Sequence, residues 1–244
     1  MTKILYKVAP EGLLSSGRVL NTQTYNYGLV TEPAFAAFGE LYGAIVNCSR
    51  ATGLGFHHLT IIAMAFQERT DGALALAKVI STRKGTGAVM LNEYLPLVVF
   101  PSPVSLAHIY QVADVAFKCE APIDPSHGFD NGLWEYLYEQ IRETQAPHAP
   151  PRSSVVYASP DVENAERFMS SYPSYGDTIW TLDVSECESQ FAADMTWLNK
   201  IQSSDNANNA AILVQSYWKQ VASQDPIMEV LLEGEMMVGE TLVR

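Results

Sequence analysis

The spacing of hydrophobic positions changes twice along the chain. Residues 3–8 (KILYKV) form a short apolar run that ends at a proline- and glycine-containing stretch, so the pattern predicts a strand followed by a turn. In residues 33–141 most apolar side chains recur three or four positions apart, which predicts helices. Beyond residue 152, short runs rich in β-branched and aromatic residues return, and these predict strands.

The predicted elements follow from these runs and from their end signals. Helices are expected over residues 33–45, 54–67, 73–80, 103–117, 130–141, 161–172 and 210–221. Strands are expected over residues 95–100, 153–158, 178–184 and 226–240, the last as one strand or a hairpin. Residues 17–27 predict an extended piece or an ordered loop, and residues 194–201 a short helix or loop. Residues 146–152 (APHAPPR) predict a stiff connector.

This order predicts an α+β fold. One strand precedes a helical middle, and a β-rich third follows the proline connector. We expect a single domain of 244 residues, in which residues 1–27 and 150–244 form the β-rich core. Residues 31–147 would then be a mainly helical insertion or subdomain.

Composition and charge narrow the classes of protein. Apolar residues make up 48% of the chain, which is enough for a sizeable core. The formal charge of −12 argues against non-specific binding to nucleic acid or anionic membranes. The apolar stretch over residues 59–66 is too short to span a bilayer. The three cysteines show no CxxC or zinc-type spacing, so we expect reduced thiols in a soluble, cytoplasmic protein.

Familiar site motifs are missing, and the fragments that remain have simpler interpretations. No P-loop, no GxGxxG, no GxSxG and no HExxH occurs, and residues 52–55 (TGLG) are only a fragment of a phosphate loop. Asp124, His127 and Asp130 could cluster around a metal in a hydrolase, but a solvated turn with a helix cap explains them better. The adjacent His57 and His58 would point about 100° apart on a helix. We expect no metal.

Three segments, taken together, resemble a known family. Residues 153–159 (SSVVYAS) look like a strand opened by serines, and residues 228–232 (MEVLL) look like a strand opened by a glutamate. Residues 5–8 (LYKV) stand where a first strand would carry an arginine. Taken in their order along the chain, the three segments resemble the arginine–serine–glutamate branch of the ADP-ribosyltransferase superfamily. The resemblance covers roughly residues 1–25 and 150–244 and leaves the helical middle unmatched.

The resemblance implies a split β-sheet core with a large helical insertion, and an enzyme that consumes NAD. Glu229 would be the catalytic carboxylate, holding the ribose 2′-hydroxyl and stabilising the oxocarbenium-like charge that forms when the nicotinamide–ribose bond breaks. The residues implied to hold NAD are Tyr6, Lys7, Arg152, Ser153, Ser154, Tyr157 and Phe168. Of these, Tyr157 or Phe168 would stack on nicotinamide. ADP-ribose would pass to a macromolecular acceptor, such as a protein, or to water.

Two departures from the family pattern change the expected function. Lys7 replaces the first-strand arginine and lacks its bidentate fork, which Arg152 could supply instead. Ile227 stands where arginine-modifying members carry a second acid, so an acceptor other than arginine, or hydrolysis of NAD, is expected.

The alternative is a non-enzymatic, degenerate member of the fold whose acidic surface binds a basic partner. Separately, if these residues have only structural roles, Glu229 would face solvent at a strand start, Ser154 would follow a proline turn, and the aromatics would belong to the core. A structure distinguishes the two by whether Glu229, Ser154 and Lys7 or Arg152 converge.

Overall fold

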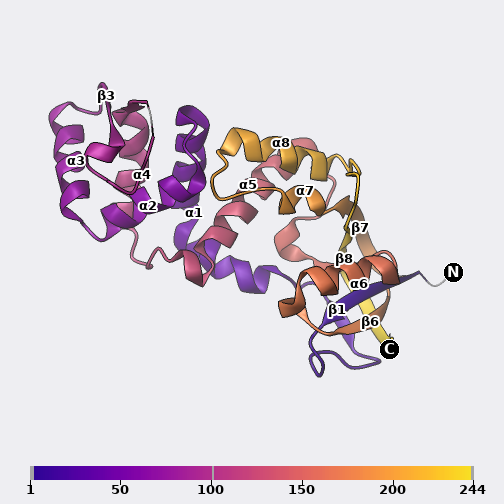
Figure 1. Cartoon of the computed structure of the whole chain (residues 1–244). Coiled ribbons are helices and arrows are strands. Elements are labelled where there is room, and N and C mark those ends of the chain that lie inside the picture. Colours follow the sequence, from indigo (N-terminus) through magenta and orange to yellow (C-terminus); the bar gives the residue numbers. More distant parts are fainter. Residues whose placement is uncertain (1–2, 101, 243–244) are drawn as a thin grey trace. The chain divides into compact units, whose positions relative to one another are not determined.

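The protein has a mixed α+β fold with an antiparallel sheet, as the sequence predicts (Figure 1). The structure is a computed structural model that describes residues 3–100 and 102–242, without the side chains of Val30 and His127. Its longer helices are α1 (Gly28–Thr52), α2 (Phe56–Gln67), α3 (Asp71–Thr82), α4 (Leu106–Lys118), α5 (Phe129–Gln145), α6 (Val162–Ser171) and α8 (Ala207–Trp218). The single-turn α7 is Thr196–Asn199, and the 3-10 turns are η1 (Leu91–Glu93), η2 (Pro125–His127), η3 (Arg152–Ser154) and η4 (Pro173–Tyr175). The strands are β1 (Ile4–Ala9), β2 (Val19–Asn21), β3 (Ala88–Val89), β4 (Val104–Ser105), β5 (Val156–Ala158), β6 (Thr178–Asp183), β7 (Cys187–Asp194) and β8 (Met228–Thr241).

The chain divides into two compact units. The β-rich unit contains the described residues of 1–32, 139–200 and 213–244, and the helical unit contains residues 33–138 and 201–212. The helical unit therefore takes in residues 201–212, which the sequence pattern had grouped with the β-rich core.

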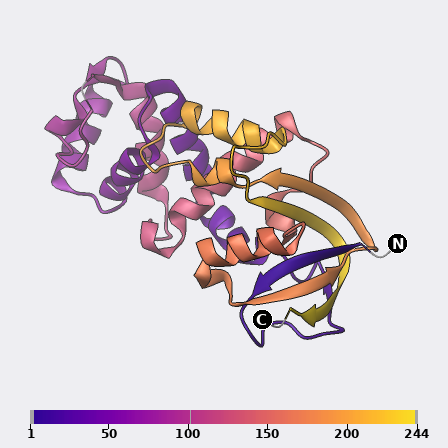
Figure 2. The same ribbon diagram turned by 45° about the vertical axis from the view of Figure 1, so that its right-hand side comes forward.

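The β-rich unit is organised around the long strand β8. Its first half pairs with β5 on one side and β7 on the other, and its second half pairs with β2 and β6. β1 then joins the outer edge of β6. The halves meet at Gly234, whose φ of +106° favours glycine, and β8 curves along its length (Figure 2). A Cβ at Gly234 would lie 2.7 Å from the backbone nitrogen of Glu188, so the close pairing of β7 also requires glycine here.

An apolar cluster lies at the centre of the strands of the β-rich unit. It collects inward-facing side chains from β1, β5, β6 and β8, among them Leu5, Val156, Leu182 and Leu232. Short runs rich in β-branched and aromatic residues are the pattern that predicted these strands. Helix α6 packs against β1 and starts where Asp161 accepts a hydrogen bond from the Asn164 backbone at 2.8 Å, confirming the predicted start.

The helical unit has a separate core. Its fully buried side chains include Leu59 and Ile62 from α2, Leu76 from α3, and Ile109 and Val112 from α4. Each of these helices was expected from the 3.6-residue spacing of its apolar positions, although its first and last residues differ slightly from those expected. α1 begins at Gly28, five residues before the expected start, and so encloses Pro33.

Two of the predicted strands were wrong or incomplete, and the eight-residue strand β7 was missed. Residues 95–100 form no strand, because Pro96 interrupts the run and Leu97 and Val99 are exposed at 76% and 75%. The expected strand over residues 153–158 begins only at Val156, after the turn η3. β7 was not expected, because the first half of this segment carries polar and acidic residues and its alternation of apolar and polar positions is weak.

Candidate active site around Glu229

Glu229 lies near the start of β8, between two strands. It pairs with Ala193 of β7, and the next residue, Val230, pairs with Ala158 of β5. The side chain is almost fully buried, at 6% exposure, so the expectation that a purely structural Glu229 would face solvent is wrong. A buried carboxylate is costly unless it is hydrogen-bonded or paired, so its neighbours determine what it can do.

Two side chains meet the Glu229 carboxylate. Arg152 Nη1 lies 2.5 Å from Glu229 Oε1 and forms an ion pair with it. The Tyr217 hydroxyl donates to the same oxygen at 2.6 Å and accepts from Arg152 Nη1, also at 2.6 Å. The three groups therefore form a closed triangle of short, charge-assisted contacts. Burial raises the pKa of Tyr217 well above its usual value, so Tyr217 remains a hydrogen-bond donor at neutral pH.

The backbone turn η3 directs Arg152 toward this triangle. Pro150 and Pro151 precede the turn, and the Ser154 amide donates to the Pro151 carbonyl at 3.0 Å. The guanidinium carbon of Arg152 lies 5.0 Å from the centre of the Tyr157 ring and 5.2 Å from that of Tyr217. Both distances are within the range of a cation–π contact, so aromatic rings orient the guanidinium.

Lys7 approaches the same region from β1. Its Nζ donates to the carbonyl of Tyr157 at 3.2 Å. Two backbone hydrogen bonds, of 3.0 and 2.6 Å, join Tyr6 to Ser159 immediately after β5 and hold the strands together. Desolvation by burial lowers the pKa of Lys7 from 10.5 to about 8.

The serines predicted to hold NAD lie in η3 and not in a strand. The Ser154 hydroxyl donates to the Pro151 carbonyl at 3.2 Å, within its own turn. The Ser153 carbonyl lies against α1, where a Cβ at Gly28 would come within 2.3 Å of it. Both serines therefore shape the turn that carries Arg152, which corrects their assignment to the start of a strand.

Phe168 sits in an aromatic group on α6 and η4. Its ring centre lies 5.0 Å from that of Tyr172 and 5.6 Å from that of Tyr175. Burial raises the pKa of Tyr172, and the negative charge of Glu229 raises it further. Within this group, Tyr172 is therefore the residue that the charge of Glu229 affects.

Tyr217 and Asn164 are the residues that the sequence pattern did not single out. Tyr217 was expected only as part of the apolar face of a helix. A buried tyrosine hydroxyl needs a hydrogen-bond partner, and this requirement was the one feature that could have identified Tyr217 from the sequence. Asn164 Oδ1 accepts from the Met228 backbone amide at 2.9 Å, which anchors α6 beside the start of β8.

The other candidate sites have structural explanations. Asp124 Oδ1 accepts a hydrogen bond from the Ser126 backbone amide at 2.8 Å, which confirms the turn interpretation. The side chain of His127 lies outside the described part of the structure. In the described residues no group of three or more His, Cys, Asp or Glu side chains could hold a metal. The rings of His57 and His58 stack at 3.7 Å between centres, so they lie closer together than an ideal helix predicts.

The glycine-containing stretch at residues 52–55 also has a structural role, at the start of α2. At the start of α2, the amides of Phe56 and His57 donate to backbone carbonyls of Asp205 and Ser203, at 3.1 and 3.0 Å. These amides are the groups that a phosphate would need. The fragment therefore caps a helix within the helical unit.

Cys48, Cys119 and Cys187 are free thiols, with Cys48 buried and the others half-buried. Burial raises the pKa of Cys187 to about 11.

Across the described residues, no helix combines the length and the apolar character needed to cross a bilayer.

Residues 128–243, slightly less than half of the chain, match a family described as "Protein of unknown function (DUF2441)". No curated protein matches the sequence. The matched region contains Arg152, Tyr157, Tyr217 and Glu229 but not Lys7.

Proposed function

We propose that the protein is an NAD-dependent enzyme of the ADP-ribosyltransferase type. It would bind NAD, break the bond between nicotinamide and ribose, and pass ADP-ribose to a macromolecular acceptor or to water. The observation that carries the proposal is the buried carboxylate of Glu229 at the start of β8, ion-paired with Arg152. Buried, specifically partnered carboxylates are typical of catalytic sites, although structural ion pairs share this property.

Strand adjacency supports the proposal. The three segments that resemble the family lie far apart in the chain, yet β5 pairs with β8 and is bridged to β1 through Tyr6 and Ser159. Glu229, Arg152, Tyr157 and Lys7 are thereby linked by direct contacts within the β-rich unit. A shared NAD site would require these residues to lie in one part of the unit, and this series of contacts is consistent with that requirement.

In the proposed reaction, the bond between ribose C1′ and the nicotinamide nitrogen breaks, and nicotinamide leaves with both electrons. The ribose then carries positive charge, which the Glu229 carboxylate stabilises while it accepts a hydrogen bond from the 2′-hydroxyl. A nucleophile of the acceptor, or water, attacks C1′ and releases its proton to solvent. The residues of this chain supply electrostatic stabilisation and orientation.

The contacts revise the roles of two basic residues. Because Arg152 Nη1 already bonds Glu229 and Tyr217, we assign Arg152 to positioning the carboxylate, together with Tyr217. Lys7 is then the residue that we assign to binding a phosphate of NAD. A phosphate next to its ammonium would favour the charged form and offset the lowered pKa.

The acceptor is expected to be something other than arginine. The position two residues before Glu229 is Ile227, whose backbone amide donates to Asp194 Oδ1 at 3.1 Å and to Thr196 Oγ1 at 3.0 Å. This backbone is held in place and presents an apolar side chain where a second acid would be needed.

The test is nicotinamide release from NAD, with and without candidate acceptor proteins, by the wild type and by Glu229→Gln. We expect the variant to lose activity by a factor on the order of 10²–10³, the usual cost of removing one charge-stabilising group. Glu240→Gln, an exposed change on the same strand, is the control and should keep wild-type turnover. Thermal melting checks that each variant is folded. Equal turnover by folded Glu229→Gln and wild type would contradict the proposal.

One observation favours a non-enzymatic alternative, in which a degenerate fold binds a basic partner. Glu229 Oε1 already accepts from two buried groups, and a buried ion pair of this kind can be purely structural. Thermal stability with added NAD separates the two functions. A protein that binds NAD gains about 2.7 kcal/mol at a hundredfold excess over the dissociation constant. No gain at millimolar NAD, together with a co-purifying basic protein, would favour the alternative.

A further inference from the structure

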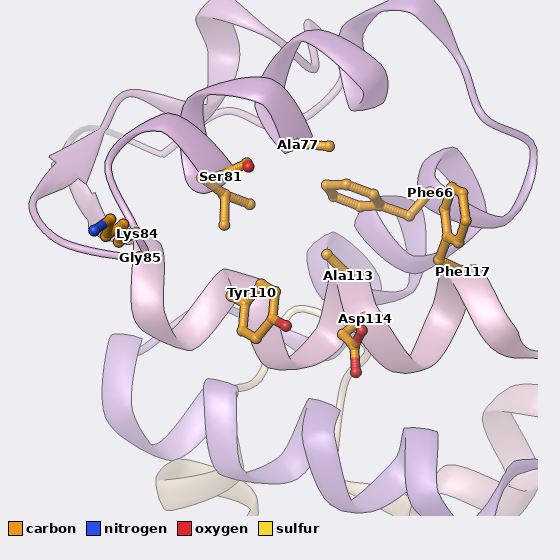
Figure 3. Close-up of a pocket in the computed structure, with 10 residues that line it drawn as sticks. Phe66, Ala77, Ser81, Lys84, Gly85, Tyr110, Ala113, Asp114 and Phe117 are labelled. Atoms are coloured by element: carbon orange, nitrogen blue, oxygen red, sulfur yellow. The ribbon is translucent and has the colours of Figure 1, made fainter.

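The helical unit contains a groove that the proposed NAD chemistry does not use. It has a volume of about 580 Å³ and lies between α3 and α4, with Phe66 of α2 beside Phe117 (Figure 3). The volume lies within the range of natural ligand sites, roughly 300–1,000 Å³. All of its lining residues belong to the helical unit.

The two walls carry matched helical stripes. α4 contributes Tyr110, Ala113, Asp114 and Phe117, at positions i, i+3, i+4 and i+7. α3 contributes Ala77, Ile80 and Ser81, at positions i, i+3 and i+4, and the loop after it adds Lys84 and Gly85. A stripe from position i to i+7 of a helix is about 10 Å long, so the groove accommodates roughly two helical turns of a second element.

Small side chains create the hollow, and large apolar ones remain exposed at its edge. Ala77, Ser81 and Ala113 leave room along the walls, whereas Tyr110 and Phe117 are 50% and 45% exposed. Exposed aromatic rings beside small residues are typical of a surface that receives large apolar side chains.

Basic groups lie at both ends of the groove, although the whole chain is acidic. The Arg69 guanidinium lies 4.4 Å from the centre of the Phe117 ring at one end, and Lys84 lies at the other (Figure 3). The acid in the lining, Asp114, is ion-paired with Lys118 at 2.7 Å, so it does not offset them. The rim therefore favours an occupant with negative charges at the ends of an apolar stripe.

We propose that this groove docks an amphipathic helix of a partner protein, with large apolar residues one to two turns apart and acidic residues flanking them. Recognition would follow the helix-in-groove mode, in which positions i, i+4 and i+7 of the partner fill the hollow. The proposal is independent of the NAD site, because no residue of one contributes to the other.

The experiment uses the full chain and a display library of helical peptides of roughly 14–18 residues, long enough for a stable docked helix. Enriched peptides are synthesised with a fluorophore, and their dissociation constants are measured by fluorescence anisotropy. We expect enrichment of apolar residues at i, i+4 and i+7 with Asp or Glu on both flanks. Peptides of the same composition in scrambled order should not bind.

Variants of exposed groove residues locate the binding site. Phe117→Ala and Ser81→Glu should each raise the dissociation constant at least tenfold, the change expected for loss of one central contact. Lys84→Glu should raise it several-fold and lessen its dependence on salt. Leu97→Ala removes an exposed apolar side chain elsewhere in the same unit and should leave binding unchanged.

Three outcomes would overturn the proposal. The first is a library that yields no binder, or enriched sequences without helical spacing or with basic flanks. The second is enriched peptides that bind folded Ser81→Glu and Phe117→Ala as tightly as they bind the wild type. Binding of an apolar carboxylate such as decanoate, weakened by Phe117→Ala and without any peptide binding, would identify a small-molecule site instead.

Discussion

Replacing Tyr217 by Phe tests the triangle around Glu229 most directly. The change removes only a hydroxyl that donates to Glu229 Oε1 and accepts from Arg152 Nη1, each at 2.6 Å. A hydrogen bond to a charged group contributes about 1.5–3 kcal/mol. Because the ion pair between Arg152 and Glu229 remains, we expect Tyr217→Phe to lower the unfolding free energy by about 2–3 kcal/mol. For a protein of this size that corresponds to roughly 5–10 °C in Tm.

A second buried tyrosine provides a matched control. Tyr42 is as fully buried as Tyr217, but within the described part of the chain its hydroxyl has no hydrogen-bond partner. Tyr42→Phe removes an unsatisfied polar group, so the unfolding free energy should stay the same or rise slightly. Chemical denaturation followed by circular dichroism measures both changes. Similar losses in the two variants, or no loss in Tyr217→Phe, would refute the assigned hydrogen bonds.

Further predictions concern the backbone and Lys7. Gly28→Ala should destabilise the β-rich unit in thermal melts, because its Cβ would lie 2.3 Å from the Ser153 carbonyl. Gly39→Ala, on the same helix with open space around it, should stabilise by about 0.5–1 kcal/mol, and the reverse order would contradict the packing at η3. Lys7 has its pKa lowered from 10.5 to about 8, so the unfolded state binds more protons between these values and stability should rise with pH in this window. Denaturation at several pH values should show no such rise for Lys7→Met. If Lys7 holds a phosphate, NAD affinity should fall above pH 8 in the wild type but not in Lys7→Arg, as titration calorimetry would show.

Local patterns predicted the elements well where short-range physics decides them. The helices over α2, α3 and α4 follow from apolar spacing, and the start of α6 follows from the Asp161 cap. The same reasoning was wrong for residues 95–100. There an apolar run suggested a strand, but Leu97 and Val99 face solvent. An apolar run forms a strand only where a neighbouring strand supplies backbone partners.

The sequence by itself determined the α+β order of elements and the position of Glu229 near the start of a strand, because these depend on interactions between residues close in the chain. Only the tertiary structure decided that Glu229 is buried and that Arg152 and Tyr217 meet its carboxylate. Arg152 and Glu229 are 77 positions apart, and Arg152 and Tyr217 are 65 apart. Their contact depends on the turn η3 and on β8 lying between β5 and β7, and no local spacing encodes that path.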